Sequence, residues 1–257
     1  MTFIIAELGV NHDGKWERGL DLIDAAKEAG ADAVKFQMFN SQRLWGDDRI
    51  EHLEFGEKEI LAMHAHCDEV GIEFMCTPFG VPEVKLLSPM VNRWKIASGC
   101  LTHWDLLTAV RETGLPVILS TGMSDLGRIK AALNVLGSAT LLHCTSAYPC
   151  PRSEVNLSAM NTLRHHFACP VGYSDHTDGI LVALAAAACG ATVIEKHLTM
   201  NRNAEGPDHK ASIEPSEFKL MVDGIRKIEH ILGKPEKRLQ PSEATVAKAW
   251  NIQEKLQ

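Results

Sequence analysis

The sequence lacks the features that mark secreted, membrane-embedded or nucleic-acid-binding proteins. Lys and Arg number 26 against 33 Asp and Glu, a net charge of −7, so the basic surplus of a nucleic-acid-binding surface is missing. No run reaches the roughly 18 apolar residues of a membrane span, and the opening MTFIIAELGV has no basic lead of a secretory signal. The seven cysteines form no CxxC pair, which is typical of a reducing compartment. We therefore expect a cytoplasmic protein without nucleic-acid or membrane partners.

No G-x-G-x-x-G motif follows any β-rich segment, which argues against an open doubly wound sheet, the alternative fold for this pattern. The chain instead alternates eight short β-rich runs with helical stretches, and its 257 residues match the length typical of a (β/α)8 TIM barrel, an α/β fold. The strands are expected at 3–9, 31–37, 72–79, 93–99, 116–122, 139–145, 170–176 and 191–199. The helices are expected at 16–29, 57–70, 82–89, 104–113, 124–136, 157–167, 179–189 and 215–232.

The segment KPEKRLQPSE (234–243) is linker-like, but too little of the sequence follows it for a second domain. We expect a single TIM-barrel domain over 1–257, with an extra helix in 240–257. Its apolar stripe is expected to pack on the barrel. The stripe consists of Val246, Ala249, Trp250 and Leu256.

Polar side chains end every predicted strand, and barrel enzymes carry their catalytic groups at these carboxyl ends. One Ser, Thr or His at a strand end is more often a turn, a cap or a structural hydrogen bond. Eight polar ends on one rim instead indicate a functional site. The candidates from the strand ends are Glu7, Lys35, Thr77, Lys95, Ser98, Cys100, Ser120, Ser146, Tyr148, Ser174, His176, Glu195 and His197.

Two histidines at neighbouring strand ends suggest a metal site. His176 ends the seventh predicted strand and His197 lies in the eighth, so both should project over the same opening. Neutral imidazoles suit a first-row divalent ion, and two ligands leave positions for water and substrate. Nearby carboxylates could orient the ligands or move protons. These carboxylates are Asp175, Glu195 and Asp208.

Two lysines within strands suggest an anionic substrate. Lys35 and Lys95 should both be buried in the barrel, where a cation requires a partner charge. Glu7 could supply that charge in a purely structural ion pair. A phosphate or carboxylate of a substrate could also supply it, with Thr77, Ser98 and Ser120 as neutral donors. A third alternative is a Schiff-base lysine activated by desolvation.

The strand ends together spell a pattern that resembles the sialic acid synthase family. The matching segments run in order from about residue 3 to 243: IAELGVNHDG, AGADAVKFQ, FMCTPF, KIASG, PVILSTGM, LLHCTSAYP, VGYSDHT, VIEKHLT and GPDH. The resemblance implies condensation of phosphoenolpyruvate with a sugar acceptor, an aldose or an N-acylhexosamine, to give a nonulosonic 3-deoxy-2-keto acid and phosphate. It also implies a homodimer.

The resemblance implies a role for each matching residue. The metal ligands match His176 and His197, and the ion is expected to be Mn²⁺ or Mg²⁺. Glu7 matches an acidic residue near metal and acceptor, Asp208 a carboxylate near the sugar, and Tyr148 an acceptor-pocket tyrosine. The phosphoenolpyruvate-binding residues match Lys35, Thr77, Lys95, Ser98, Ser174 and the polar position Ser146.

Three departures from the family concern the acceptor and the addition of water. Cys100 stands where the family usually has Glu, and a thiol with a pKa near 8.5 is a poor substitute for a carboxylate. Either a carboxyl group of Glu7, Glu195 or Asp208 takes over, or the reaction differs, or Cys100 only fills space. The family's C-terminal antifreeze-like domain has no counterpart in these 257 residues, and the polar loop 38–56 is short.

Two other functions remain open at this point. An aldolase or lyase could reuse the enolpyruvate pocket through Lys35 or Lys95, and borohydride trapping with pyruvate would detect its Schiff base. A ligand-binding barrel could also be inactive without a separate antifreeze-like subunit. Binding of phosphoenolpyruvate without turnover would identify that case.

Overall fold

Eight parallel strands form the centre of the protein, as expected for the TIM barrel. The computed structural model describes residues 1–252. The strands are β1 (Phe3–Gly9), β2 (Ala33–Met38), β3 (Glu73–Pro78), β4 (Trp94–Ile96), β5 (Val117–Ser120), β6 (Thr140–His143), β7 (Val171–Asp175) and β8 (Val193–His197). Their hydrogen-bonded order is β3-β2-β1-β8-β7-β6-β5-β4. Packing of β3 against β4 closes the ring, which confirms the predicted fold.

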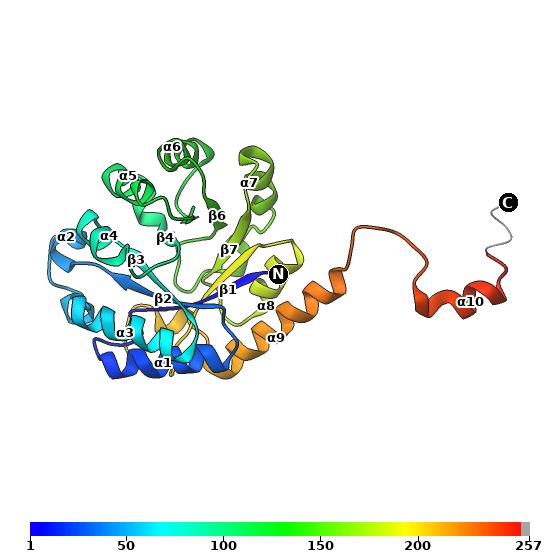
Figure 1. Cartoon of the computed structure of the whole chain (residues 1–257), viewed down its shortest axis with the longest axis horizontal. Helices are drawn as coiled ribbons and strands as arrows, with labels where there is room; N and C mark the ends of the chain where they lie inside the picture. The colour runs from blue at the N-terminus through cyan, green and yellow to red at the C-terminus, as the bar shows by residue number, and fades with distance from the viewer. Residues whose placement is uncertain (253–257) are drawn as a thin grey trace.

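Helices alternate with the strands and surround them (Figure 1). They are α1 (Trp16–Glu28), α3 (Glu57–Val70), α4 (Val81–Leu87), α5 (Trp104–Glu112), α6 (Leu126–Leu136), α7 (Ala159–Phe167), α8 (Leu181–Ala188) and α9 (Pro215–Leu232). Their apolar faces share one large hydrophobic core with the outward-facing strand residues. Among the helices of the described residues, none combines the length and the apolar character of a membrane span.

Strand alternation separates the barrel interior into an apolar layer and a polar layer. Side chains two residues apart point to the same face of a strand. A small inner cluster of Ile5, Ala33, Met75, Ile118, Leu142 and Val193 fills the amino-terminal half of the barrel. Two residues further along their strands lie Glu7, Lys35, Thr77, Ser120 and Glu195. The same alternation that builds the apolar layer therefore directs a ring of polar groups into the opening above it.

The structure differs from the predicted boundaries at β4 and in the loop after β2. The predicted strand 93–99 stops at Ile96, and Ser98–Cys100 form a 3-10 turn. The polar loop 38–56 contains the short helix α2 (Ser41–Trp45). Asn40 caps α2 by accepting a hydrogen bond from the Arg43 backbone N–H at 3.1 Å, and Gly46 ends it in the left-handed conformation. Local capping groups, rather than hydrophobic periodicity, produce this helix.

The C-terminal segment does not pack on the barrel, so that prediction is wrong. Its helix, α10 (Ala244–Ala249), is shorter than expected and lies away from the barrel beyond an extended stretch (Figure 1). Val246 and Trp250 of the predicted stripe are 59% and 69% exposed, and Leu256 lies outside the described residues. The connecting residues 233–243 are all exposed and mainly polar, so this stretch is not held against the barrel. The single domain over 1–257 stays a prediction.

Candidate active site at the carboxyl ends of the strands

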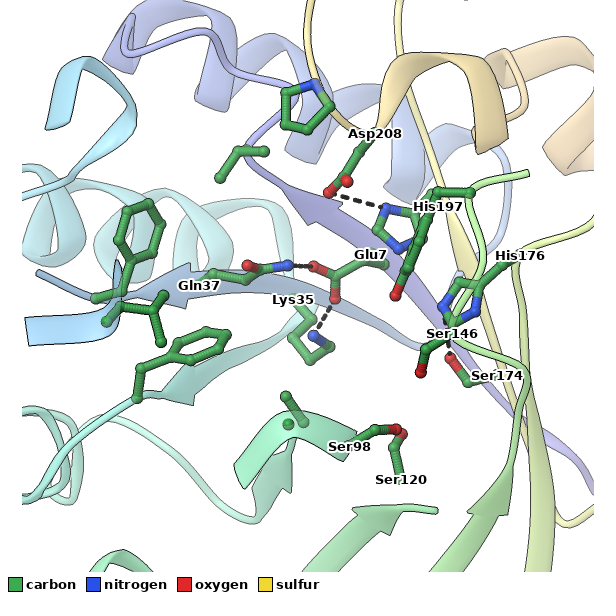
Figure 2. Close-up of a pocket in the computed structure, with 18 of the residues that line it drawn as sticks. Glu7, Lys35, Gln37, Ser98, Ser120, Ser146, Ser174, His176, His197 and Asp208 are labelled. Carbon is green, nitrogen blue, oxygen red and sulfur yellow. Dashed lines mark hydrogen bonds and ion pairs between the residues drawn. The ribbon is translucent and has the colours of Figure 1, made fainter. Parts of the chain in front are cut away.

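A cavity of about 470 Å³ opens at the carboxyl ends of the strands. All predicted site residues line it except Thr77, Cys100 and Asp175. The lining residues predicted from the sequence are Glu7, Lys35, Lys95, Ser98, Ser120, Ser146, Tyr148, Ser174, His176, Glu195, His197 and Asp208. Residues from seven different strands and their following loops thus converge on one space (Figure 2).

Two buried lysines and two carboxyl groups form the charged floor of this cavity. Lys35 forms an ion pair with Glu7, and its Nζ also donates to Thr77 Oγ1 at 3.0 Å. Glu195 lies between the lysines, with Oε1 at 3.2 Å from Lys95 Nζ and Oε2 at 3.8 Å from Lys35 Nζ. Ser174 Oγ donates to Glu195 Oε1 at 2.8 Å. Thr77 therefore acts on the cavity through Lys35, and Glu195 is the common partner of both lysines.

The floor controls the ionisation of its own members. Burial would raise the pKa of Glu195, but the two ammonium groups outweigh it and hold that pKa at about 2. Burial would lower the pKa of Lys35, yet the carboxylates of Glu195 and Glu7 raise it. The pKa of Lys95 is lowered, because burial outweighs its attraction to Glu195. Lys35 and Glu195 are thus a fixed ion pair, and Lys95 is the less firmly charged lysine.

Two further carboxyl groups keep a proton more readily than usual. Burial raises the pKa of Glu7 to about 7 and that of Asp208 to about 6. Gln37 Nε2 donates to Glu7 Oε1 at 2.9 Å (Figure 2). A Cβ atom at Gly9 would lie 2.9 Å from Glu7 Oε1 and 3.1 Å from Asp208 Oδ2. Gly9 has φ +47°, so glycine meets both the backbone and the space requirement at this close approach.

His176 and His197 face the same part of the cavity, with ring centroids 5.6 Å apart. His176 Nδ1 lies 2.8 Å from the Thr145 carbonyl oxygen, which only accepts, so Nδ1 carries the proton and Nε2 keeps a lone pair. Burial lowers the pKa of both histidines, so both are neutral at pH 7. His197 Nδ1 lies 3.5 Å from Asp208 Oδ2.

This pair fits a metal as a partial ligand set. Within residues 1–252, no group of three or more His, Cys, Asp or Glu side chains is arranged around a single metal position. Two neutral imidazoles can nevertheless hold a divalent ion whose other positions belong to water and substrate. The buried Nδ1 of His197 has no hydrogen-bond partner among the described residues, an orphaned donor or acceptor of the kind that a ligand satisfies.

Small side chains line a further part of the cavity wall. Ser98 Oγ accepts a hydrogen bond from the Gly122 backbone N–H at 3.0 Å. A Cβ atom at Gly122 would lie only 2.4 Å from Ser146 Oγ, so glycine is required for the three residues to meet. The Ser120 hydroxyl is buried and finds no partner within the described chain. These hydroxyl groups can donate to an anionic ligand at little steric cost.

Cys100 and Asp175 lie outside the cavity. Cys100 is 4% exposed and belongs to the hydrophobic core, where burial raises the pKa of its thiol to about 11. This position favours the space-filling interpretation of Cys100. Asp175 alternates with the inward-facing Ser174, points to the helix side, and pairs with the buried Lys196 at 3.0 Å. It does not orient the histidines, contrary to one inference from its spacing.

The sequence analysis left several cavity residues out of the predicted site. Gln37 could have been found, because it lies two residues after Lys35 on the same strand face. Trp45 and Arg49 come from the loop after β2, where no periodic pattern places a side chain. The Arg49 guanidinium lies over the Trp45 ring, 5.6 Å from its centroid. This pair forms the outer rim of the cavity.

Fold and site together define the class of protein: a TIM barrel with a polar cavity at the carboxyl ends of its strands, in which two buried lysines lie near neutral imidazoles. Comparison with known proteins then gives the family. A model described as the NeuB family matches residues 22–237. The chain belongs to the NeuB family.

Several relatives are named as synthases of sialic acids or related sugar acids. The N,N'-diacetyllegionaminic acid synthase of Campylobacter jejuni is 41% identical, over 94% of this chain and 80% of that protein. The human N-acetylneuraminate-9-phosphate synthase is 34% identical, over 94% of this chain and 74% of its own length. The crystal structure of N-acetylneuraminic acid synthetase from Leptospira borgpetersenii, in complex with citrate, superposes with a TM-score of 0.93 at 38% identity, covering 97% of this chain and 91% of that one. The expectation of a synthase-type enzyme of this family is confirmed.

Proposed function

We propose that this enzyme condenses phosphoenolpyruvate with an aldose or N-acylhexosamine to give a nonulosonic 3-deoxy-2-keto acid and phosphate, with the help of a divalent metal ion. The observation that carries the proposal is the charged floor, in which Lys35 and Lys95 share Glu195 beneath two neutral histidines. The names of several relatives, which are synthases of N,N'-diacetyllegionaminic acid, pseudaminic acid or N-acetylneuraminate 9-phosphate, support it.

The lysines would hold the two anionic ends of phosphoenolpyruvate. The carboxylate and phosphate of phosphoenolpyruvate together carry more negative charge than Glu195 and Glu7. The ammonium groups of Lys35 and Lys95 would therefore gain stronger partners on binding. Ser98, Ser120 and Ser174 would add neutral donors. The hydroxyl of Ser120 is buried without a partner among the described residues, so a bound phosphate oxygen would satisfy it.

The reaction would proceed by attack of the enol carbon on the acceptor aldehyde. A carbon–carbon bond forms, and the aldehyde oxygen takes a proton. Positive charge develops at the enol ether carbon, water adds there, and phosphate leaves by C–O cleavage. A Mn²⁺ or Mg²⁺ ion held by His176 and His197 would supply Lewis-acid polarisation of the aldehyde oxygen.

Glu7 is placed to move the protons in this sequence. Its carboxyl group is held between Gln37 Nε2 and Lys35 Nζ on the cavity side of β1. Its pKa of about 7, raised by burial, lets it exchange a proton near neutral pH. Glu195 is locked in ion pairs, and Cys100 lies in the core. Glu7, with Asp208 as its neighbour, therefore takes the place of the carboxylate that Cys100 replaces.

The first experiment measures phosphate release. Purified protein is incubated with phosphoenolpyruvate, Mn²⁺ and a panel of aldoses and N-acylhexosamines, free and phosphorylated, beside a His176→Ala variant. We expect acceptor-dependent release that the variant reduces by at least about 10²-fold, the size of losing one electrostatic stabiliser. Release that needs no acceptor, or that the variant retains, would contradict the proposal.

One observation favours a separate test of the lyase alternative. Burial lowers the pKa of Lys95, and a lysine that loses its charge more readily is a better Schiff-base nucleophile. Borohydride reduction in the presence of pyruvate, followed by peptide mass analysis, would reveal an adduct on Lys95 or Lys35. Because both ammonium groups contact Glu195, we expect no adduct.

A further inference from the structure

Two hydrogen-bonded chains tie the segment 199–212, which follows β8, to the loop that follows β1. In the first chain, Asn11 Nδ2 donates to the Leu198 carbonyl at 2.8 Å and to Ser212 Oγ at 2.9 Å. Ser212 Oγ in turn donates to the carbonyl oxygen of Asp208 at 2.7 Å. Asn11 and Ser212 are 1% and 0% exposed, so water does not compete for these bonds.

The second chain passes through the residue next to Asp208. His209 Nε2 lies 2.9 Å from Asp13 Oδ1, and His209 Nδ1 lies 2.7 Å from Thr199 Oγ1. Asp13 also forms an ion pair with Arg18. A Cβ atom at Gly206 would lie 2.7 Å from the His209 ring, so the backbone of the segment packs directly on this imidazole.

The first chain ends at Asp208 and the second holds its neighbour His209, although none of the supporting side chains lines the active-site cavity. Asp208 is carried on a loop, yet its carboxylate reaches to within 3.5 Å of His197 Nδ1 (Figure 2). Its carbonyl oxygen accepts from Ser212, and the next residue, His209, is held by Asp13. Loop-borne carboxylates need such support to keep a defined position.

We infer that Asn11, Asp13, Thr199, His209 and Ser212 form a clamp that positions the Asp208 carboxylate against the acceptor sugar. The inference rests on the proposed function, and it makes the five clamp residues positioning residues rather than catalytic ones. A displacement of about 1 Å in such a group can cost about 10²-fold in rate. The clamp acts on the acceptor, because the phosphoenolpyruvate contacts lie on Lys35, Lys95 and their serines.

The test compares Ser212→Ala and Thr199→Val, which remove one hydroxyl each with little change of shape, with Lys210→Ala. Lys210 lies in the same turn and is exposed, so its variant serves as the control. We expect kcat/KM for the acceptor to fall about ten- to hundredfold in the clamp variants, while binding of phosphoenolpyruvate, measured by calorimetry, is unchanged. The control should keep both values.

Repeating the Ser212→Ala measurement in an Asp208→Ala variant separates a positioning role from a general loss of structure. In Asp208→Ala, the group to be positioned is missing, so adding Ser212→Ala should cause no further loss of kcat/KM. Equal losses in both backgrounds would overturn the inference, because the serine would then act without Asp208. So would weakened phosphoenolpyruvate binding in the single clamp variants.

Hydrogen exchange tests the clamp without turnover. Amides in peptides covering 8–15 and 199–213 should exchange faster in Ser212→Ala and Thr199→Val than in wild type and in Lys210→Ala. Unchanged exchange would overturn the clamp even if the enzyme is active. If wild type shows no acceptor-dependent turnover, the proposed function fails, and the exchange comparison still decides whether the clamp exists.

Discussion

The floor and the outer rim of the cavity differ in almost every physical property. The floor consists of Lys35, Lys95, Glu7 and Glu195, each at most 3% exposed, on strands whose backbones are fixed by the barrel. The rim consists of Trp45 and Arg49 on the segment that follows β2, and Trp45 is 56% exposed. The floor can hold an anion in one geometry, whereas the rim can change without disturbing the barrel. We propose that the floor serves the reaction itself and that the rim selects the acceptor.

The largest effect is expected for Lys35→Met. The variant removes one of the two cations for phosphoenolpyruvate, so kcat/KM should fall by about 10²–10³-fold. Glu7, left without its partner, can take up a proton because burial already raises its pKa to about 7, so the fold should survive. Steady-state phosphate release and calorimetric titration with phosphoenolpyruvate measure the effect. Lys58→Met on the exposed face of α3 is the control.

Unchanged affinity for phosphoenolpyruvate in Lys35→Met would contradict the role given to the floor. The lysine would then be only the structural partner of Glu7, and the floor would have no part in binding the substrate.

The second effect concerns the pH dependence of stability. His12 stacks on Phe55 with ring centroids 3.7 Å apart, and burial lowers the pKa of His12 from 6.5 to about 4. The unfolded chain therefore binds the proton first, so the stability that His12 contributes is complete above pH 6.5 and is lost as the pH falls towards 4. The loss is about 3 kcal/mol at most. Urea unfolding at pH 7 and pH 4.5 measures it.

The matched variant is His12→Asn, which keeps a small polar side chain but does not titrate. Its stability should fall less than that of wild type between the two pH values, whereas His230→Asn, exposed on α9, should behave like wild type. An identical fall in all three proteins would mean that other groups cause the acid sensitivity.

A smaller effect is expected for Trp45→Ala at the rim. An aromatic face against a sugar ring contributes about 1 kcal/mol, so KM for the acceptor should rise about five- to tenfold. KM for phosphoenolpyruvate should not change, because Trp45 lies far out on α2. Trp250→Ala, in the segment away from the barrel, provides an exposed tryptophan for comparison. A change in phosphoenolpyruvate KM would show that rim and floor are not separate.

The smallest effect is expected for Cys100→Ala. The thiol lies in the core and not in the cavity wall, so its loss should lower the free energy of unfolding by about 1 kcal/mol. The value of kcat should change less than twofold. A tenfold drop in kcat at unchanged stability would instead assign the thiol a part in the reaction.

The floor was predictable because strand alternation is local. Glu7, Lys35, Ser120 and Glu195 each stand two residues after an apolar inner residue, and a period of two needs only the neighbouring sequence. The rim was not predictable in the same way. Trp45 and Arg49 depend on a helix of five residues that is set by one asparagine cap and one glycine, in a stretch without hydrophobic periodicity.

The sequence by itself determined the eight strand–helix units, the polar carboxyl ends of the strands and the family of the protein, because each is written in short segments. Only the tertiary structure decided that Glu195 is shared by two lysines, that Cys100 lies in the core, and that Asn11 reaches Ser212. These contacts join residues up to about 200 positions apart. They depend on the barrel, in which β1 pairs with β8. A local sequence pattern cannot predict contacts between residues so far apart in the chain.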